Sequence, residues 1–136
     1  MRRIFQVLSA TVLGVTLVVA GATPAAAQAP QRISFSKGND NAAVRGAIKG
    51  REYRDYLLRA SKGQKMSVSL ITDGTAYFNI LPPGSTGEGI FNGSMSGANT
   101  TVTLPKDGDY TIRVYLMGAA KSEKKAVPYT VSVTIM

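Results

Sequence analysis

Cationic and tyrosine side chains gather in two short stretches of this 136-residue chain. The first is the segment 51–56, Arg-Glu-Tyr-Arg-Asp-Tyr, and the second is the segment 113–125, which ends in a group of lysines. A tyrosine ring buries a large area with few rotatable bonds, and a cation can enter an acidic pocket, so this composition is typical of protein interfaces. We predict five partner-binding residues: Arg51, Tyr53, Lys121, Lys124 and Lys125.

Both stretches also have a purely structural interpretation. Lysines in a loop often serve only to keep it solvated. Tyrosines in a strand, here Tyr53 and Tyr56, are often half-buried members of a sheet. Arg54 and Tyr56 belong to the same first cluster of binding candidates but are not among the five predicted residues, and the sequence leaves both interpretations open.

Catalytic chemistry is poorly represented in the sequence. The chain contains neither histidine nor cysteine, which excludes thiol catalysis, Ser-His-Asp triads and the zinc sites built from those residues. Glu52 and Asp55 lie among arginines, and nearby cations favour the charged form of a carboxylate, the wrong direction for a general acid. Asp107 and Asp109 fall in a turn, where they are expected to cap backbone donors rather than hold calcium, which needs six or more oxygens. We predict a binding protein that is not an enzyme and has no cofactor or metal.

The first 27 residues have the three parts of a secretory signal peptide. Arg2 and Arg3 precede a short apolar stretch, and the Ala25–Ala27 tripeptide offers a cleavage site. The apolar stretch is shorter than the ~20 residues that span a bilayer, so we predict cleavage near Ala27 and no stable membrane insertion. The remaining segment, 28–136, is predicted to be one domain that is periplasmic or secreted and folds without disulfides.

The domain 28–136 is basic, with 14 lysines and arginines against 8 acidic residues. Nucleic acid is the usual partner of a basic domain, but export and the scattering of the charges argue against it. Lipid headgroups, cell-wall polymers or an acidic cleft of another protein are the remaining partners.

Short segments of alternating apolar and polar residues dominate the domain. Glycine, proline and Asp-Gly turns separate them, and no sustained helical period occurs, so we predict an all-β fold, a single antiparallel β-sandwich of the jelly-roll-like kind with about eight strands. The predicted strands are 32–36, 43–48, 54–60, 65–70, 76–81, 100–104, 110–116 and 129–135.

The segment 50–70 is the clearest part of this pattern. It predicts a hairpin in which the turn Ser61–Gln64 joins two strands. Asp73 and Gly74 predict a second hairpin, and the strand 76–81, apolar on both faces, is a candidate for the centre of a sheet. The segment 84–99 is predicted to be a surface loop pinned by Ile90 and Phe91, with a binding loop as the alternative.

Several short motifs, in this order, resemble the bacterial periplasmic inhibitors of g-type (goose-type) lysozyme and, more loosely, the bacterial pre-peptidase C-terminal domain. The motifs are Ile33-Ser-Phe-Ser-Lys-Gly38, Gly46-Ala-Ile-Lys-Gly50, Tyr53 with Tyr56, Ala60-Ser-Lys-Gly-Gln-Lys65, Gly108-Asp-Tyr110, Arg113-Val114 and Tyr129-Thr-Val131. Most of them mark turns and strand starts.

The resemblance implies a β-sandwich that occludes the active-site cleft of a lysozyme, with the g-type favoured, and so protects peptidoglycan. Such a cleft contains carboxylates, with which basic loops could pair. The loop 117–128 tends to be arginine-rich in this family, whereas here it carries lysines, which act as point charges rather than bidentate partners. The alternatives are a noncatalytic cell-envelope or carbohydrate-binding module of the pre-peptidase type, or a structural envelope protein.

Overall fold

The structure is a computed structural model that describes residues 29–85 and 87–136. The predicted signal peptide, 1–27, lies outside the described residues. Among those residues no helix is both long and apolar enough to span a membrane. The strands are β1 (Gln31–Arg32), β2 (Asn41–Ile48), β3 (Tyr53–Ala60), β4 (Lys65–Thr72), β5 (Ala76–Leu81), β6 (Phe91–Asn92), β7 (Asn99–Thr103), β8 (Gly108–Leu116) and β9 (Val127–Ile135); α1 (Gly93–Ser96) and the 3-10 helix η1 (Gly118–Ser122) are the helices.

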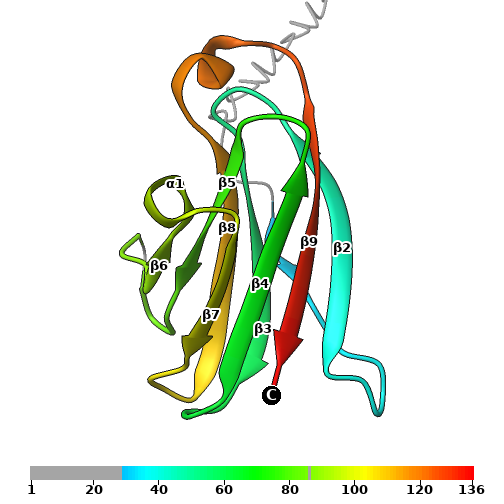
Figure 1. The fold of residues 1–136 in the computed structure, drawn as a ribbon, viewed down its shortest axis with the longest axis vertical. Coiled ribbons are helices and arrows are strands. Elements are labelled where there is room, and N and C mark those ends of the chain that lie inside the picture. The colour runs from blue at the N-terminus through cyan, green and yellow to red at the C-terminus, as the bar shows by residue number, and fades with distance from the viewer. Residues whose placement is uncertain (1–28, 86) are drawn as a thin grey trace, which may run out of the picture.

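The strands form two facing sheets (Figure 1). Sheet A has the order β1-β3-β8-β5-β6, and sheet B has the order β2-β9-β4-β7. All pairs are antiparallel except β1 with β3. The predicted all-β sandwich is confirmed, and the described part of the chain contains nine strands rather than about eight.

The predicted hairpin of segment 50–70 is wrong, although both of its strands exist. The turn is present, with the N–H of Gln64 donating to the carbonyl of Ser61 at 3.1 Å. However, β3 belongs to sheet A and β4 to sheet B, so the turn crosses from one sheet to the other. The turn at Asp73 and Gly74 makes the same kind of crossing between β4 and β5. Alternation of apolar and polar residues reveals which side chains of a strand face the core. Because both sheets face the same core, alternation cannot show to which sheet a strand belongs.

Three smaller expectations have mixed outcomes. The strand predicted at 32–36 is reduced to β1, although Ile33 still donates its N–H to the carbonyl of Leu57 at 2.8 Å. β5 pairs on both sides, with β8 and with the two-residue β6, so it is an interior strand of sheet A. In the segment 84–99, Phe91 stacks on Phe78 at 5.0 Å between ring centroids, whereas Ile90 is exposed.

The core lies between the sheets and includes one polar contact. Tyr56 of β3 and Tyr129 of β9 are buried, and their hydroxyls meet at 2.6 Å across the sandwich. Gly46 of β2 makes room for this pair, since a Cβ there would come within 2.5 Å of the Tyr129 hydroxyl. Burial and the hydrogen bond with Tyr56 raise the pKa of Tyr129, while nearby Arg54 acts in the opposite direction.

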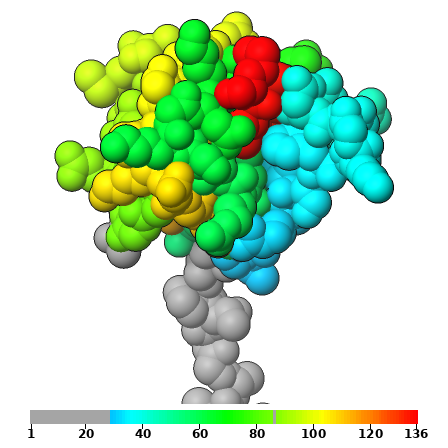
Figure 2. Space-filling model, turned by 90° about the horizontal axis from the view of Figure 1, so that it is seen from below, coloured from blue at the N-terminus to red at the C-terminus, as the bar shows by residue number. Residues whose placement is uncertain are grey.

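One end of the sandwich, which we call the closed end, contains the turns 37–40, 61–64 and 104–107 and the C-terminus (Figures 1 and 2). Backbone hydrogen bonds join its segments: Lys65 and Met136 exchange two of them, at 2.9 and 3.0 Å. Asp107 accepts from the backbone N–H of Lys62 at 2.6 Å, as expected for an aspartate in a turn. The opposite end, which we call the open end, contains the turns 49–52 and 73–75 and the segment 117–126.

Candidate functional site

The turn between β2 and β3 places Arg51 at the open end. Gly50 has a φ of +61°, a value that glycine adopts without strain, and the N–H of Glu52 donates to the carbonyl of Lys49 at 3.1 Å. The Glu52 side chain turns back and accepts from the backbone N–H of Lys49 at 3.2 Å. This carboxylate therefore serves the turn, and the Arg51 side chain is left exposed at its tip.

The segment after β8 folds over the same end. Gly118, with a φ of +64°, starts η1, and Ala120 anchors it in the core while Lys121 remains exposed. A Cβ on Gly50 would lie 3.5 Å from the carbonyl oxygen of Lys121. The turn 49–52 and η1 are thus packed backbone to backbone, which brings their side chains to one place.

The result is a hollow of about 330 Å³, which we call the basic hollow. Tyr53 and Tyr115 are directly opposite each other in the β3–β8 ladder and form part of its wall. The hollow is lined by Arg51, Glu52, Tyr53, Arg113, Tyr115, Leu116 and Lys121. Three of the five predicted binding residues, Arg51, Tyr53 and Lys121, are therefore brought together.

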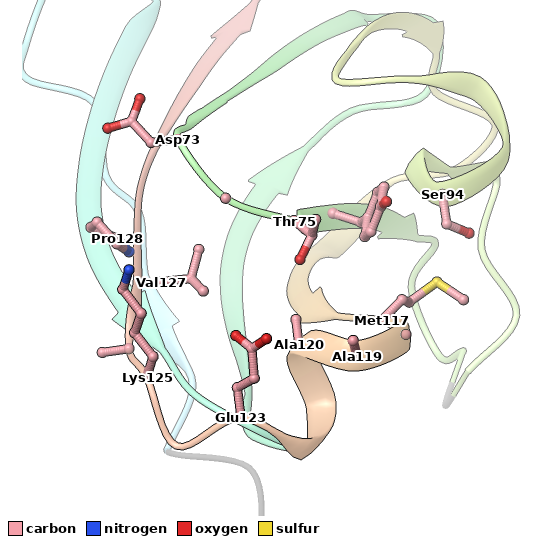
Figure 3. Close-up of a pocket in the computed structure, with 14 residues that line it drawn as sticks. Asp73, Thr75, Ser94, Met117, Ala119, Ala120, Glu123, Lys125, Val127 and Pro128 are labelled. Atoms are coloured by element: carbon pink, nitrogen blue, oxygen red, sulfur yellow. The ribbon is translucent and has the colours of Figure 1, made fainter.

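A second, larger hollow of about 740 Å³ lies beside η1, and we call it the mixed hollow. Figure 3 shows Met117 and Ser94 on one side of it and Lys125 with Val127 on the other. Its charged lining residues are Asp73, Glu123 and Lys125. Lys125 is thus separated from the basic hollow, and Lys124 is exposed and lines neither hollow.

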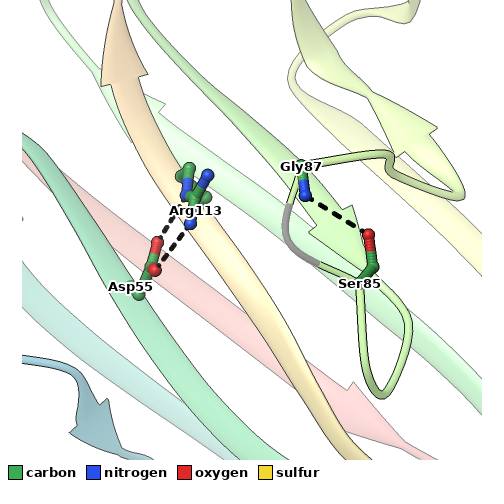
Figure 4. Close-up of polar contacts among 4 residues, drawn as sticks. All are labelled: Asp55, Ser85, Gly87 and Arg113. Carbon is green, nitrogen blue, oxygen red and sulfur yellow. Dashed lines mark hydrogen bonds and ion pairs between the residues drawn. The ribbon is translucent and has the colours of Figure 1, made fainter.

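An ion pair supports the floor of the basic hollow. Arg113 donates from Nε and Nη2 to the two carboxylate oxygens of Asp55, at 2.8 and 3.0 Å (Figure 4). Its guanidinium carbon lies 4.4 Å from the centroid of the Tyr53 ring. The hydrogen bond with Asp55 raises the pKa of Arg113, against the opposing effect of burial.

Within the described parts of the chain, none of the lysines and arginines predicted to bind another protein forms an ion pair. The ion pairs in those parts are Arg113 with Asp55 and Arg32 with Asp109. Arg51 and Lys121 stand beside one carboxylate, Glu52, which is occupied by the turn. The basic hollow therefore presents positive charge and tyrosine to an incoming surface.

Tyr56 is wrong as a binding residue, because it is fully buried and bonded to Tyr129. Arg54 lies on the same face of β3 and is partly buried, with its Nε buried without a hydrogen-bond partner among the described residues, and its part in binding stays a prediction. The alternation of β3 places Tyr53 outward and Tyr56 inward, so counting by twos from Leu58 could have separated the two tyrosines.

Arg113 and Tyr115 belong to the second stretch noted in the sequence, but they are not among the five predicted binding residues. Their outward orientation follows from the alternation of β8, but their place opposite Asp55 and Tyr53 depends on the β3–β8 register. No sequence signal indicated the mixed hollow. Among the described residues, no group of three or more acidic side chains is arranged to hold a metal ion.

No protein-family model matches the chain. An inhibitor of g-type lysozyme from Escherichia coli (strain K12) is 29% identical over 106 residues, which is 76% of this chain and 78% of the relative. The crystal structure of a periplasmic inhibitor of g-type lysozyme from Aeromonas hydrophila is 30% identical, covers 79% of this chain and 96% of its own, and has a TM-score of 0.74.

A looser likeness concerns the fold alone. The pre-peptidase C-terminal domain of a collagenase from Bacillus anthracis matches 77% of this chain and 94% of its own with a TM-score of 0.56, at 15% identity. Both resemblances noted in the sequence are thus confirmed, the first at the level of sequence and structure and the second at the level of architecture.

Proposed function

The chain belongs to the family of periplasmic inhibitors of g-type lysozyme, and we propose that it inhibits such an enzyme by covering its active-site cleft with the open end of the sandwich. The relatives are inhibitors rather than enzymes, in agreement with the absence of histidine and cysteine from this sequence. The proposal concerns the surface used, the residues that make contact and the reason they suit a lysozyme.

The observation that carries this proposal is the convergence of Arg51, Tyr53 and Lys121 around one hollow. Glycoside hydrolases cleave their substrates with carboxylates placed in a groove. The two cations have no ion-pair partner within the described residues, so a carboxylate of the enzyme can take that place. Tyr53 offers a ring that buries area at low entropic cost beside that contact.

The mixed hollow extends the proposed contact surface. It borders η1, so a partner that covers the basic hollow also meets its rim. Met117 is 41% exposed there and Met95, next to the lining residue Ser94, is 82% exposed. Methionine adapts its shape to a partner, and exposed apolar side chains of this kind mark interaction surfaces. We propose that a projection of the lysozyme surface occupies this hollow.

The test is an inhibition assay with the purified domain 28–136 and a g-type lysozyme acting on cell walls. Two double variants divide the predicted residues by their place in the structure. We expect Arg51→Glu with Lys121→Glu to raise the inhibition constant at least about 100-fold, because it turns two attractive contacts with carboxylates into repulsive ones. Lys124→Glu with Lys125→Glu lies outside the basic hollow, with Lys125 on the wall of the mixed hollow, and should raise the inhibition constant less, by about 10-fold or less.

The assay also defines what would contradict the proposal. If the wild-type domain at micromolar concentration leaves the g-type lysozyme fully active, the proposed function is wrong. If it inhibits, but the second double variant loses more affinity than the first, the contact surface lies on the far part of the loop 117–126 rather than at the basic hollow.

A further inference from the structure

The ring of Tyr53 is supported by an arrangement of three side chains on the outward face of sheet A. Asp55 and Arg113 face each other in the β3–β8 ladder and form a two-pronged ion pair. The guanidinium of Arg113 lies against the Tyr53 ring, which is two residues along β3 on the same face. A cation near the face of an aromatic ring attracts it electrostatically.

The geometry of this arrangement requires both partners of the ion pair. Asp55 occupies two of the guanidinium's donors, which fixes the plane in which the group lies. The side chains of Arg113 and Asp55 are 26% and 13% exposed, so the pair is partly shielded from water and less mobile than a surface pair. With the guanidinium fixed, the ring that stacks on it has fewer orientations available.

We propose that Asp55 is a positioning residue for partner binding, which acts through Arg113, itself part of the lining of the basic hollow, to hold Tyr53 in its binding orientation. The inference rests on the proposed function of the open end. A ring that is already held loses less conformational freedom when the partner arrives, and this raises affinity without adding a contact.

The same sheet contains a natural control. Arg32 and Asp109 form a second two-pronged pair, at 3.0 and 2.9 Å, on the edge of sheet A and toward the closed end. Their side chains are 50% and 40% exposed. Within the described residues, the only cation that lies over a ring is Arg113. The two pairs share their chemistry and differ in whether a tyrosine rests on the arginine.

The experiment compares Asp55→Asn with Asp109→Asn in the inhibition assay. We expect Asp55→Asn to raise the inhibition constant roughly 3- to 10-fold, the effect of releasing one ordered side chain, and Asp109→Asn to leave it unchanged. The weaker inhibition should appear as a faster dissociation of the complex with lysozyme, because the long-range electrostatic attraction that sets the association rate is little affected. Arg113→Lys, which keeps the charge and loses the planar group, should give a similar loss and serves if Asp55→Asn folds poorly.

A double-mutant cycle separates positioning from a general loss of structure. In a Tyr53→Ala background, Asp55→Asn should no longer affect inhibition, because the ring it positions is gone, while its effect on thermal stability should persist. The NMR signals of the Tyr53 ring should move in Asp55→Asn and stay in place in Asp109→Asn, with or without any lysozyme present.

Each contrary result has a distinct meaning. The inference is overturned if Asp55→Asn weakens inhibition equally in both backgrounds, or if the Tyr53 ring signals do not move. If Tyr53→Ala alone has no effect although the wild type inhibits, Tyr53 is no contact and the positioning role fails while the inhibitory function stands. If the wild type does not inhibit at all, the proposed function fails together with the role in binding.

Discussion

The two ends of the sandwich are built from the same kinds of residue and use them differently. At the closed end, Asp107 caps the backbone of Lys62, and the C-terminal residue pairs with Lys65. At the open end, the one carboxylate of the basic hollow caps its own turn and leaves Arg51 and Lys121 to solvent. The carboxylate and the terminus at the closed end tie backbone segments together, whereas the open end gathers two cations and two tyrosines around one hollow.

This difference separates stability from function along the long axis of the molecule. Changes at the closed end and in the core are expected to affect unfolding, and changes of charge at the open end are expected to affect inhibition. The predictions below test that separation, beginning with the largest expected effect.

Gly46→Ala should destabilise the fold by about 2 to 3 kcal/mol, because the added methyl group would overlap the hydroxyls of Tyr129 and Tyr56. The measurement is chemical unfolding of the wild type and the variant. Gly87→Ala is a suitable control, since nothing lies within 4 Å of a Cβ at that position. Equal stability of the two variants would show that the core beneath the open end has room to relax.

Tyr129→Phe should lower the free energy of unfolding by about 1 to 2 kcal/mol at neutral pH, because it leaves the buried hydroxyl of Tyr56 without its partner. Since the pKa of Tyr129 is raised in the folded protein, the unfolded chain loses this proton first as the pH rises through about 10. The wild type should therefore lose up to about 1.4 kcal/mol per pH unit above that point through this one group.

Unfolding by urea between about pH 8 and pH 11 measures this effect. The variant lacks the group, so the difference in stability between wild type and variant should shrink as the pH rises. A difference that stays constant over this range would mean that Tyr129 titrates alike in the folded and unfolded chains.

Asp107→Ala should destabilise the protein by about 1 kcal/mol, through loss of the hydrogen bond to the backbone N–H of Lys62. Because the change lies at the closed end, inhibition of lysozyme should be unaffected at a temperature where the variant is folded. Thermal unfolding and the inhibition assay on one preparation measure both quantities. A loss of inhibition without a loss of stability would contradict the proposed separation of the two ends.

Lys37→Glu with Lys65→Glu should have the smallest effect. Both lysines are exposed near the closed end, and the double variant changes the net charge as much as the variant of Arg51 and Lys121 does. We expect the inhibition constant to change by about threefold or less, since only long-range attraction is altered. An equal loss in both double variants would mean that inhibition depends on total charge rather than on the basic hollow.

The sequence predicted the strands better than their pairing. Alternation in Met66, Val68 and Leu70 correctly indicated a strand with one buried face. It could not show that β3 and β4 belong to different sheets, because the inward side chains of both sheets pack into one core. The Asp-Gly turn was misleading for the same reason, since a tight turn can cross between sheets as well as join neighbours.

The site was predictable in part. Residue types alone pointed to Arg51, Tyr53 and Lys121, which do lie together. The separation of Lys124 and Lys125 from them depends on how η1 folds back over the turn 49–52, a contact between backbones that leaves no pattern in the sequence. The role of Asp55 likewise depends on its register with Arg113.

The order of strands in sheet B constrains when the domain can fold. β9 is the last strand of the chain and lies between β2 and β4, so Asn41 pairs with Thr134 across almost the whole domain. Contacts between residues so distant in sequence make folding slow. Sheet B can therefore close only once β9 is present, and removal of β9 would separate β2 from the rest of its sheet.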